Sequence, residues 1–319
     1  MKVYKVDITP RSVFKDIPSS YTIFGAICWA YRILYGKDRL NDMLIDFENR
    51  NIPFLVSSFM PKVNGKYYFP RPNLKAQRKD SVKGDYKRLK KISYVEFDIF
   101  KRVLDAEIKT EFELNEALSN MSDELSKISI ASKYYISRAS IDRINSTIDG
   151  SGQLYFEEVV GLTDSFMLVA VKDNEVEKEL KAVFRLLEDI NIGGNRSIGY
   201  GKVVFGDFQE FEELEAYFNT QTDTFISLAP VIPEPATYDL ENSYYQYFTF
   251  RGAIDNDYDF KDIDIWKDKV IYLQEGSVFH IKSPKTFYGT FYKAKDLKGN
   301  TIFQYGLSFP LFIQKGAIP

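Results

Sequence analysis

INIGGNRSIGYGKVVFGDF, residues 190–208, contains four glycines within nine positions. The preceding run EVEKELKAVFRLLEDI (175–190) keeps its apolar residues on one face at helical spacing. The run KVVFGDF (202–208), which ends the stretch, is typical of a strand. The sequence therefore predicts a glycine-rich loop (191–201) that leaves a helix and enters a strand. Its glycines are Gly193, Gly194, Gly199 and Gly201.

Glycine-rich loops often hold phosphate, but this loop matches neither of the two common nucleotide motifs. A P-loop has a lysine directly after its second glycine, whereas here Tyr200 follows Gly199. The later pair Gly201-Lys202 is followed by Val203, which has no hydroxyl to hold magnesium. A dinucleotide fingerprint lies between a strand and a following helix, the reverse of the order predicted here. We expect no helix N-terminus to face the loop, which argues against a nucleotide enzyme.

The same loop is suited to a phosphodiester chain. Glycines lack Cβ and accept positive φ, so backbone N–H groups can line up against RNA, while Arg196 and Ser197 add a charge and a hydroxyl. The structural alternative is a helix C-cap followed by a bulge. Four glycines exceed what a cap needs, so we favour contact with an RNA backbone. Tyr200 either stacks on a base or packs on the sheet.

The rest of the chain predicts an α+β fold in two domains, 1–210 and 211–319. Two strand-like runs at 133–144 and 152–160 flank a polar tip and predict a projecting hairpin (about 131–160). The second domain is expected to be mostly β. The other predicted elements are strands at 1–10, 54–60, 66–69 and 166–172, a turn at Asn64-Gly65, and helices starting at Ser19-Ser20 and at 94–104, 114–125 and 210–218.

Composition and charge exclude several classes of protein. The 319 residues are 45% hydrophobic and include one cysteine, Cys28, which rules out an internal disulfide and a cysteine zinc site. With no signal peptide and no long apolar run, we expect a soluble cytoplasmic protein. The net charge of −3 is unevenly distributed. Residues 71–91 carry nine Lys/Arg and two Asp, while residues 207–264 carry fourteen Asp/Glu and two Lys/Arg. The basic stretch is either a solvated loop or a surface for a polyanion.

Several segments resemble one family. The glycine-rich segment GGNRSIGYGKV (193–203), between a helix and a strand, is similar to the loop of the repeat-associated (RAMP) proteins of CRISPR systems. SSYTIFGAICWAY (19–31) resembles the first helix of one branch. RASIDR (138–143) and GQLYFEE (152–158) resemble the strands of its thumb hairpin. EGSVF (275–279) and YGLSFPL (305–311) resemble its C-terminal domain. That branch is the fourth Csm subunit of type III-A interference complexes.

The resemblance implies two ferredoxin-like (RRM-like) domains, the second degenerate and mostly β, with the hairpin as a thumb. It also implies a subunit without a cofactor that holds the 5′ repeat-derived tag of the guide RNA (crRNA). Its implied protein partners are the large polymerase-type subunit and a backbone RAMP subunit. The tag would meet Gly193, Gly194, Arg196, Ser197, Gly199 and Gly201, with Arg138 and Arg143 of the hairpin near it. Weaker candidates, which can also face a protein partner, are Arg78, Lys79, Lys87, Arg88, Lys90 and Lys91.

We expect no catalysis. The single histidine, His280, stands in a strand-like run, Asp16 lacks the motif of target-cutting relatives, and nothing pairs Tyr31 with Lys37. The aspartates between 255 and 264 lack the glycine and glutamate of an EF-hand, so no metal site is predicted. Two alternatives stay open. One is a RAMP-type endoribonuclease that processes guide-precursor RNA, and the other is the equivalent type III-B subunit.

Overall fold

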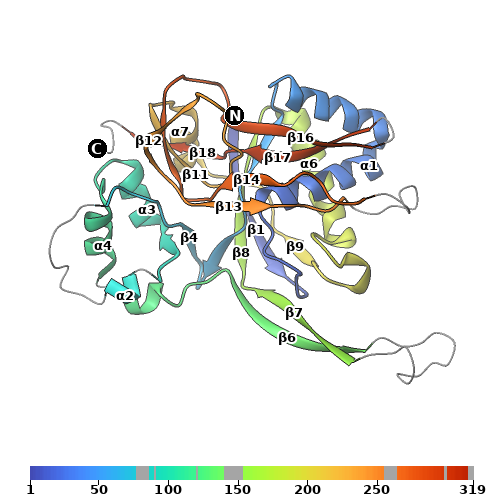
Figure 1. The fold of residues 1–319 in the computed structure, drawn as a ribbon, viewed down its shortest axis with the longest axis horizontal. Coiled ribbons are helices and arrows are strands. Elements are labelled where there is room, and N and C mark those ends of the chain that lie inside the picture. The colour runs from blue at the N-terminus through green and yellow to red at the C-terminus, as the bar shows by residue number, and fades with distance from the viewer. Residues whose placement is uncertain are drawn as a thin grey trace.

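The computed structural model describes residues 1–76, 86–89, 91–119, 121–139, 154–254, 264–297 and 300–314. It shows a mixed α/β fold with antiparallel sheets (Figure 1). The strand predicted at residues 1–10 is β1, which pairs with β8 on one side and with β9 and β10 on the other. The main sheet consists of β1 (Lys2–Pro10), β2 (Phe54–Val56), β3 (Met60–Val63), β4 (Lys66–Pro70), β5 (Tyr94–Glu96), β8 (Ser165–Val171), β9 (Val203–Phe205) and β10 (Gln209–Glu210). Its order is β10-β1-β8-β3-β4-β5, with β2 beside β8 and β9 beside β1.

Two long helices, α1 (Ser20–Glu48) and α6 (Asn174–Ile190), pack beside each other against this sheet (Figure 1). Both helices were predicted from their apolar periodicity. Helix α6 is capped by the Asp173 side chain, which accepts hydrogen bonds from the first turn. Helix α1 starts where the sequence predicts and kinks at Gly36, whose φ of 82° is non-helical.

Local signals predicted the β3–β4 hairpin correctly. Asn64 and Gly65 form its turn with φ of 51° and 78°, the positive values that a two-residue hairpin turn requires. The predicted helix 94–104 was partly wrong, because residues 94–96 pair with β4 as β5 and the helix α3 covers only Phe97–Leu104. A long-range strand pairing overrides the local helical pattern there.

A small helical lobe follows β4. It contains α3 and three further helices, α2 (Tyr86–Leu89), α4 (Glu111–Ser119) and α5 (Ser122–Leu125), so the predicted helix 114–125 is divided in two. Arg71 anchors the lobe, since its guanidinium donates to the Leu89 carbonyl at 2.6 Å and to Asn115 Oδ1 at 2.8 Å. It also pairs with Glu111.

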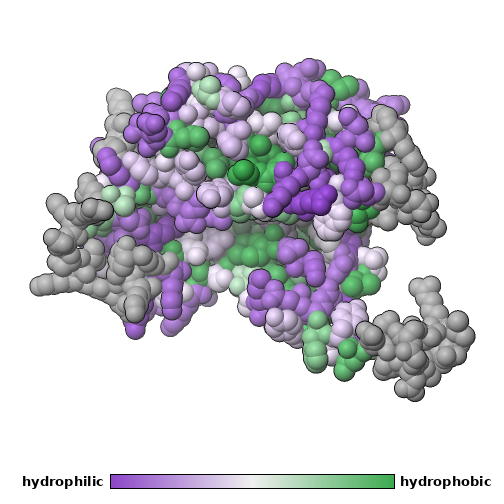
Figure 2. Space-filling model, viewed as in Figure 1, coloured by the Kyte–Doolittle hydropathy of each residue, from purple (hydrophilic) through white to green (hydrophobic). Residues whose placement is uncertain are grey.

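A two-stranded hairpin extends away from the body of the molecule (Figure 1). Strands β6 (Ala131–Ala139) and β7 (Leu154–Leu162) pair along their whole length. Its base is attached to the body where Phe14 and Val160 exchange backbone hydrogen bonds of 2.8 and 2.9 Å. Most of its side chains are exposed, and Figure 2 shows apolar residues on it. Leu154 and Phe156 are 63% and 70% exposed.

The chain after residue 210 is mostly β, as predicted. A short helix, α7 (Glu212–Asn219), precedes a sheet and two paired ribbons. The sheet consists of β12 (Tyr238–Tyr244), β15 (Val278–Ile281), β11 (Thr224–Ser227) and β18 (Pro310–Phe312); the ribbons are β13 (Tyr247–Phe250) with β14 (Val270–Leu273), and β16 (Gly289–Leu297) with β17 (Asn300–Leu307).

One hydrophobic core cluster draws residues from both parts of the chain. Phe24 of α1 stacks on Tyr305 of β17 at 4.7 Å between ring centroids, and Phe47 stacks on Phe291 at 5.2 Å. The domain boundary near 210 stays a prediction, because this packing joins the two parts. No helix within the described ranges is long and apolar enough to cross a membrane.

Candidate nucleic-acid interface

The glycine-rich loop is closed at its base by Gly201. The Ile192 N–H donates to the Gly201 carbonyl at 2.9 Å, and the Gly201 N–H donates to the Val13 carbonyl at 2.9 Å. Gly201 has φ of 76°, and a Cβ there would lie 1.8 Å from the Ile192 oxygen, so no other residue fits. Gly201 is buried. Both of its backbone groups are bonded within the chain, so its role in the structure is to hold the loop.

The outer part of the loop lies against the segment that leads into α1. A Cβ on Gly193 would lie 3.9 Å from Thr22 Cγ2, and one on Gly194 would lie 3.5 Å from Lys15 Cβ. Thr22 belongs to the first turn of α1. The start of a helix therefore lies beside the loop, where the sequence predicted that no helix N-terminus would face it. The reason is that this helix is not the next element in sequence but is brought in by the pairing of β9 with β1.

The tip of the loop presents several groups to solvent. Arg196–Ile198 form a single 3-10 turn, after which Gly199 has φ of 88°. Gly194, Ser197 and Gly199 are exposed, while Arg196 is half-buried. Burial lowers the pKa of the Arg196 guanidinium from its ordinary value. The tip therefore offers a guanidinium, a hydroxyl and glycine backbone close together.

Glu157 of the hairpin strand β7 binds the loop from the other side. Its Oε1 accepts from Asn195 Nδ2 at 2.9 Å and from Lys15 Nζ at 3.4 Å. Its Oε2 accepts from the Tyr200 hydroxyl at 2.8 Å and from Arg138 Nε at 3.1 Å. The bond from Tyr200, followed by that from Lys15, holds the pKa of Glu157 below its ordinary value. The loop and the hairpin base thus form one connected polar network.

Tyr200 does not offer a stacking surface. Only 2% of the residue is exposed, and the Arg138 guanidinium lies over its ring at 4.8 Å from the centroid. The stacking alternative is therefore wrong, and the buried ring packs against Arg138 and Glu157 of the hairpin base. Arg138 lies beside the loop, and its charge is paired with Glu157. Its position near the tag stays a prediction.

The described part of the basic segment lies away from the loop. Figure 1 shows α2, which contains Arg88, in the helical lobe at the left of the view, whereas β9 lies to the right of the base of the hairpin. Arg88 is exposed and paired with Asp123, and Lys91 is also exposed. The remaining predicted site residues, Arg143, Arg78, Lys79, Lys90 and the Lys87 side chain, lie outside the described part of the chain.

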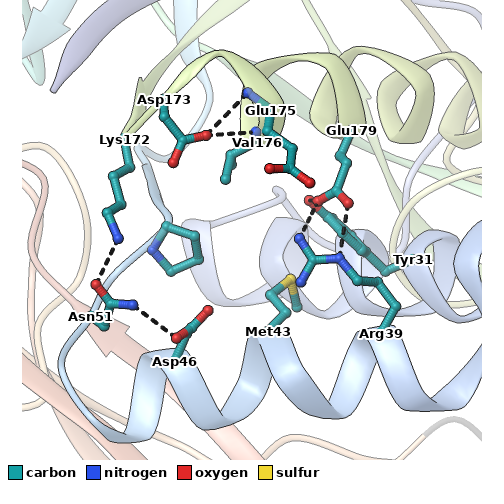
Figure 3. Close-up of a pocket in the computed structure, with 11 residues that line it drawn as sticks. Tyr31, Arg39, Met43, Asp46, Asn51, Lys172, Asp173, Glu175, Val176 and Glu179 are labelled. Carbon is teal, nitrogen blue, oxygen red and sulfur yellow. Dashed lines mark hydrogen bonds and ion pairs between the residues drawn. The ribbon is translucent and has the colours of Figure 1, made fainter.

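A pocket of about 270 Å³ lies between α1 and the start of α6 (Figure 3). The Arg39 guanidinium binds both carboxylate oxygens of Glu179 at 2.9 and 2.7 Å. The Tyr31 hydroxyl donates to the same carboxylate at 3.2 Å, and burial raises its pKa well above its ordinary value. Tyr31 therefore stays protonated and bound within the pocket wall. It is not paired with Lys37, which is exposed.

The other candidate catalytic and metal residues are dispersed. His280 lies on β15 with Nδ1 3.2 Å from Thr224 Oγ1, and Asp16 is exposed in the segment before α1. Of the predicted aspartate run, only Asp264 is described, and it pairs with Lys295 at 3.1 Å. Among the residues that the structure describes, no three His, Cys, Asp or Glu side chains gather as metal ligands would.

A model of the RAMP superfamily matches residues 15–204. The chain belongs to the RAMP superfamily. The matched region contains Lys15, the hairpin and the glycine-rich loop, so every described member of the Glu157 network lies within it. The order of helix, glycine-rich loop and strand in the sequence predicted this membership correctly.

One curated relative and two solved structures illustrate the similarity. The chain is 27% identical over 305 residues to the CRISPR system Cms protein Csm4 of Methanocaldococcus jannaschii, with 81% of this chain and 78% of the relative covered. It is similar in fold to a chain of the Csm3-Csm4 subcomplex of the type III-A CRISPR-Cas interference complex. That likeness has a TM-score of 0.60 at 21% identity, covering 97% of this chain and 98% of that one. For a chain of the Csm1-Csm4 cassette in complex with cA4, the TM-score is 0.59 at 18% identity, and the alignment covers 99% of this chain and 100% of that one.

Sequence reasoning missed Glu157, Lys15 and Asn195. A carboxylate is not expected in a site for RNA, and only the strand register places Glu157 directly opposite Ile136 and on the same face as Arg138. The alternation of β7 was a usable signal, because in a two-residue period Tyr155, Glu157 and Val159 share one face.

Proposed function

We propose that this chain is a non-catalytic, RNA-binding subunit of a type III-A CRISPR effector complex in the cytoplasm. In this proposal it holds the 5′ repeat-derived tag of the crRNA and docks the large polymerase-type subunit. The observation that carries the proposal is the junction of the glycine-rich loop with the hairpin base, where Gly194, Ser197 and Gly199 are exposed beside Arg196. Similarity to Csm4 over most of both chains supports it.

The strand order supports a ferredoxin-like first domain. In chain order β1, α1, β2, β8, α6 and β9 follow the βαββαβ pattern, and β9-β1-β8-β2 are neighbours in that spatial order. The hairpin β6–β7 would then be the thumb, inserted between the second and third strands. We extend the proposal to a degenerate second domain after residue 210, in which β strands dominate.

The hydrogen bonds within the loop limit which of its groups can contact RNA. Gly201 and Arg138 are committed to the fold or to Glu157, so we assign the phosphate contacts to the exposed tip. The Gly194 N–H, the Ser197 hydroxyl and the Arg196 guanidinium can bind phosphate without reading a base, whereas the Gly199 N–H already donates to the Arg196 carbonyl at 2.9 Å. Such contacts suit a guide tag whose backbone must be held in one position.

The absence of catalysis is part of the proposal. His280 lies within a sheet beside Thr224, and the Tyr31 hydroxyl is bound to Glu179. Neither is near the glycine-rich loop in sequence or through any contact that the structure describes. We therefore assign the chain a binding role.

The helical lobe is our candidate for a protein partner. The names of the similar structures pair Csm4 with Csm1 and with Csm3. By analogy, we propose a large subunit and a backbone RAMP subunit as partners here. The described parts of the basic segment, which include Arg71 and α2, belong to the helical lobe rather than to the loop, which favours a protein contact for them.

Co-purification tests this function. An affinity-tagged full chain, expressed with its neighbouring genes, should recover crRNA together with a large and a backbone subunit. Sequencing the recovered RNA 5′ ends should show one common repeat-derived tag. Recovery of proteins without RNA, or robust cleavage of repeat RNA that His280→Ala abolishes, would contradict the proposal. Partners of a type III-B complex would change the assigned complex but not the role.

A further inference from the structure

One carboxylate connects three separate segments at the proposed interface. Glu157 is on β7, Lys15 precedes α1, and Asn195 and Tyr200 belong to the glycine-rich loop. Arg138 from the paired strand β6 completes the set. Each oxygen of Glu157 accepts from one cationic side chain and from one loop residue. The carboxylate is 14% exposed, so its position is fixed by these donors rather than by solvent.

A carboxylate in this position works against simple affinity for RNA. Phosphate is repelled by it, and it occupies Lys15 and Arg138, two of the cations nearest the loop. A surface selected only for strong RNA binding would have a neutral acceptor there. Partners are often discriminated by groups that disfavour wrong ligands as well as by groups that attract the right one.

The base of the loop does not depend on Glu157. The hydrogen bonds of Gly201 with Val13 and Ile192 close it independently. What Glu157 fixes is the tip, through Asn195 and Tyr200, and the direction in which the hairpin leaves the body. Removing the carboxylate should therefore loosen the tip without unfolding the chain.

We propose that Glu157 is a positioning and specificity-determining residue for RNA. It sets the geometry between loop tip and hairpin, and it keeps Lys15 and Arg138 neutralised, so that RNA is retained only when it fits the arranged backbone groups. This inference rests on the proposed RNA-binding function. It predicts that loss of the carboxylate improves binding of unrelated RNA and impairs binding of the tag.

The test compares two RNAs on the full-length chain. The probes are a labelled RNA with the tag sequence of the co-purified guide and a scrambled RNA of the same length. For Glu157→Ala we expect the scrambled RNA to bind about 3- to 10-fold tighter, with a salt slope steeper by roughly 0.7 for each cation released. The ratio of tag to scrambled affinity should fall at least about tenfold. Glu157→Gln, which keeps one acceptor oxygen, should lie between Glu157→Ala and wild type.

Glu158 provides the matched control. It follows Glu157 but faces the opposite side of the hairpin, where it pairs with Lys133 at 2.9 Å and accepts from Tyr135 at 3.4 Å. Glu158→Gln makes the same change in net charge and should leave the tag-to-scrambled ratio unchanged. An equal fall of that ratio in both variants would overturn the inference, since net charge alone would then explain it.

Hydrogen exchange separates positioning from general destabilisation. In Glu157→Ala the amides of the tip, residues 195–200, should exchange faster while the amides of Ile192 and Gly201 stay protected. A variant that loses tag binding without any gain for scrambled RNA would overturn the inference. A wild-type chain that binds both RNAs equally would also overturn the inference, whereas a wild-type chain that binds neither RNA would overturn the proposed function, so the two failures are distinguishable.

Discussion

Two glycines of the same loop should respond very differently to alanine. Gly199 and Gly201 have φ of 88° and 76°, so both substitutions force an L-residue into the left-handed region. That change alone costs about 1–2 kcal/mol. A Cβ on Gly199 would meet nothing within 4 Å, whereas a Cβ on Gly201 would lie 1.8 Å from the Ile192 oxygen and 2.8 Å from its carbonyl carbon. Both atoms are backbone, so no side chain can rotate away.

Relief of that overlap requires the loop base to open, which breaks the hydrogen bonds of Gly201 with Ile192 and Val13. With about 1 kcal/mol for each of the two lost bonds, Gly201→Ala should cost roughly 3–4 kcal/mol in total. For a domain of about 200 residues, 1 kcal/mol lowers Tm by about 2–4 °C. We therefore expect Tm to fall by about 2–8 °C for Gly199→Ala and by roughly 6–16 °C for Gly201→Ala.

Thermal unfolding followed by circular dichroism at one protein concentration measures both variants against wild type. Because the two substitutions add the same atoms to the same loop, their difference isolates the close approach to Ile192. Equal falls in Tm would refute the reasoning, because they would mean that the loop base rearranges freely and that Gly201 is not required by packing.

Three further predictions concern charged groups. Arg196→Ala should weaken binding of the tag RNA roughly tenfold and reduce the salt slope by about 0.7. Lys91→Ala, in the helical lobe, should do neither. Equal effects of the two substitutions would contradict the contact assigned between Arg196 and an RNA phosphate. The lowered pKa of Glu157 stabilises the fold above its ordinary pKa of about 4.3, and this stabilisation is lost as the pH falls through the lowered value. The Tm difference between wild type and Glu157→Gln should therefore be constant near neutral pH and shrink below about pH 4. A Tm difference that does not change with pH would show that the ionised Glu157 carboxylate does not stabilise the fold. Arg71→Ala should lower the free energy of unfolding measured in urea by about 2–3 kcal/mol, because the Arg71 side chain is only 13% exposed and donates to three groups. Arg88→Ala should lower it by less than about 1 kcal/mol, because the pair of Arg88 with Asp123 is on the surface.

Elements specified by local physics were predictable from the sequence. The helix α6 shows its apolar stripe and its Asp173 cap, and the β3–β4 turn shows Asn64-Gly65, because each depends on residues close in the chain. The order of helix, glycine-rich loop and strand was equally local. It excluded a nucleotide fingerprint and indicated the RAMP superfamily, which the match over 15–204 confirms.

Features that depend on distant pairing were not predictable. Tyr94–Glu96 forms a strand only because β4 lies beside it, and the sequence around it favours a helix. The polar network depends on the register of β6 with β7 and on a loop 38 residues away from Glu157 along the chain. Sequence reasoning placed Arg138 near the loop but had no means of finding the carboxylate that neutralises it. Buried Tyr200 illustrates the same limit, since exposure is a property of the assembled fold.

Gly194 is the loop glycine that the fold itself does not explain. Gly193, Gly199 and Gly201 all have positive φ, but Gly194 is outside the left-handed region and exposed. A Cβ there would meet Lys15 Cβ at 3.5 Å, an ordinary contact, so alanine fits without strain. A missing side chain at an exposed, unstrained position is most simply explained by a ligand backbone that approaches closely. Gly194→Ala should therefore match the wild-type Tm and weaken tag RNA binding, and unchanged binding would show that the RNA passes the loop elsewhere.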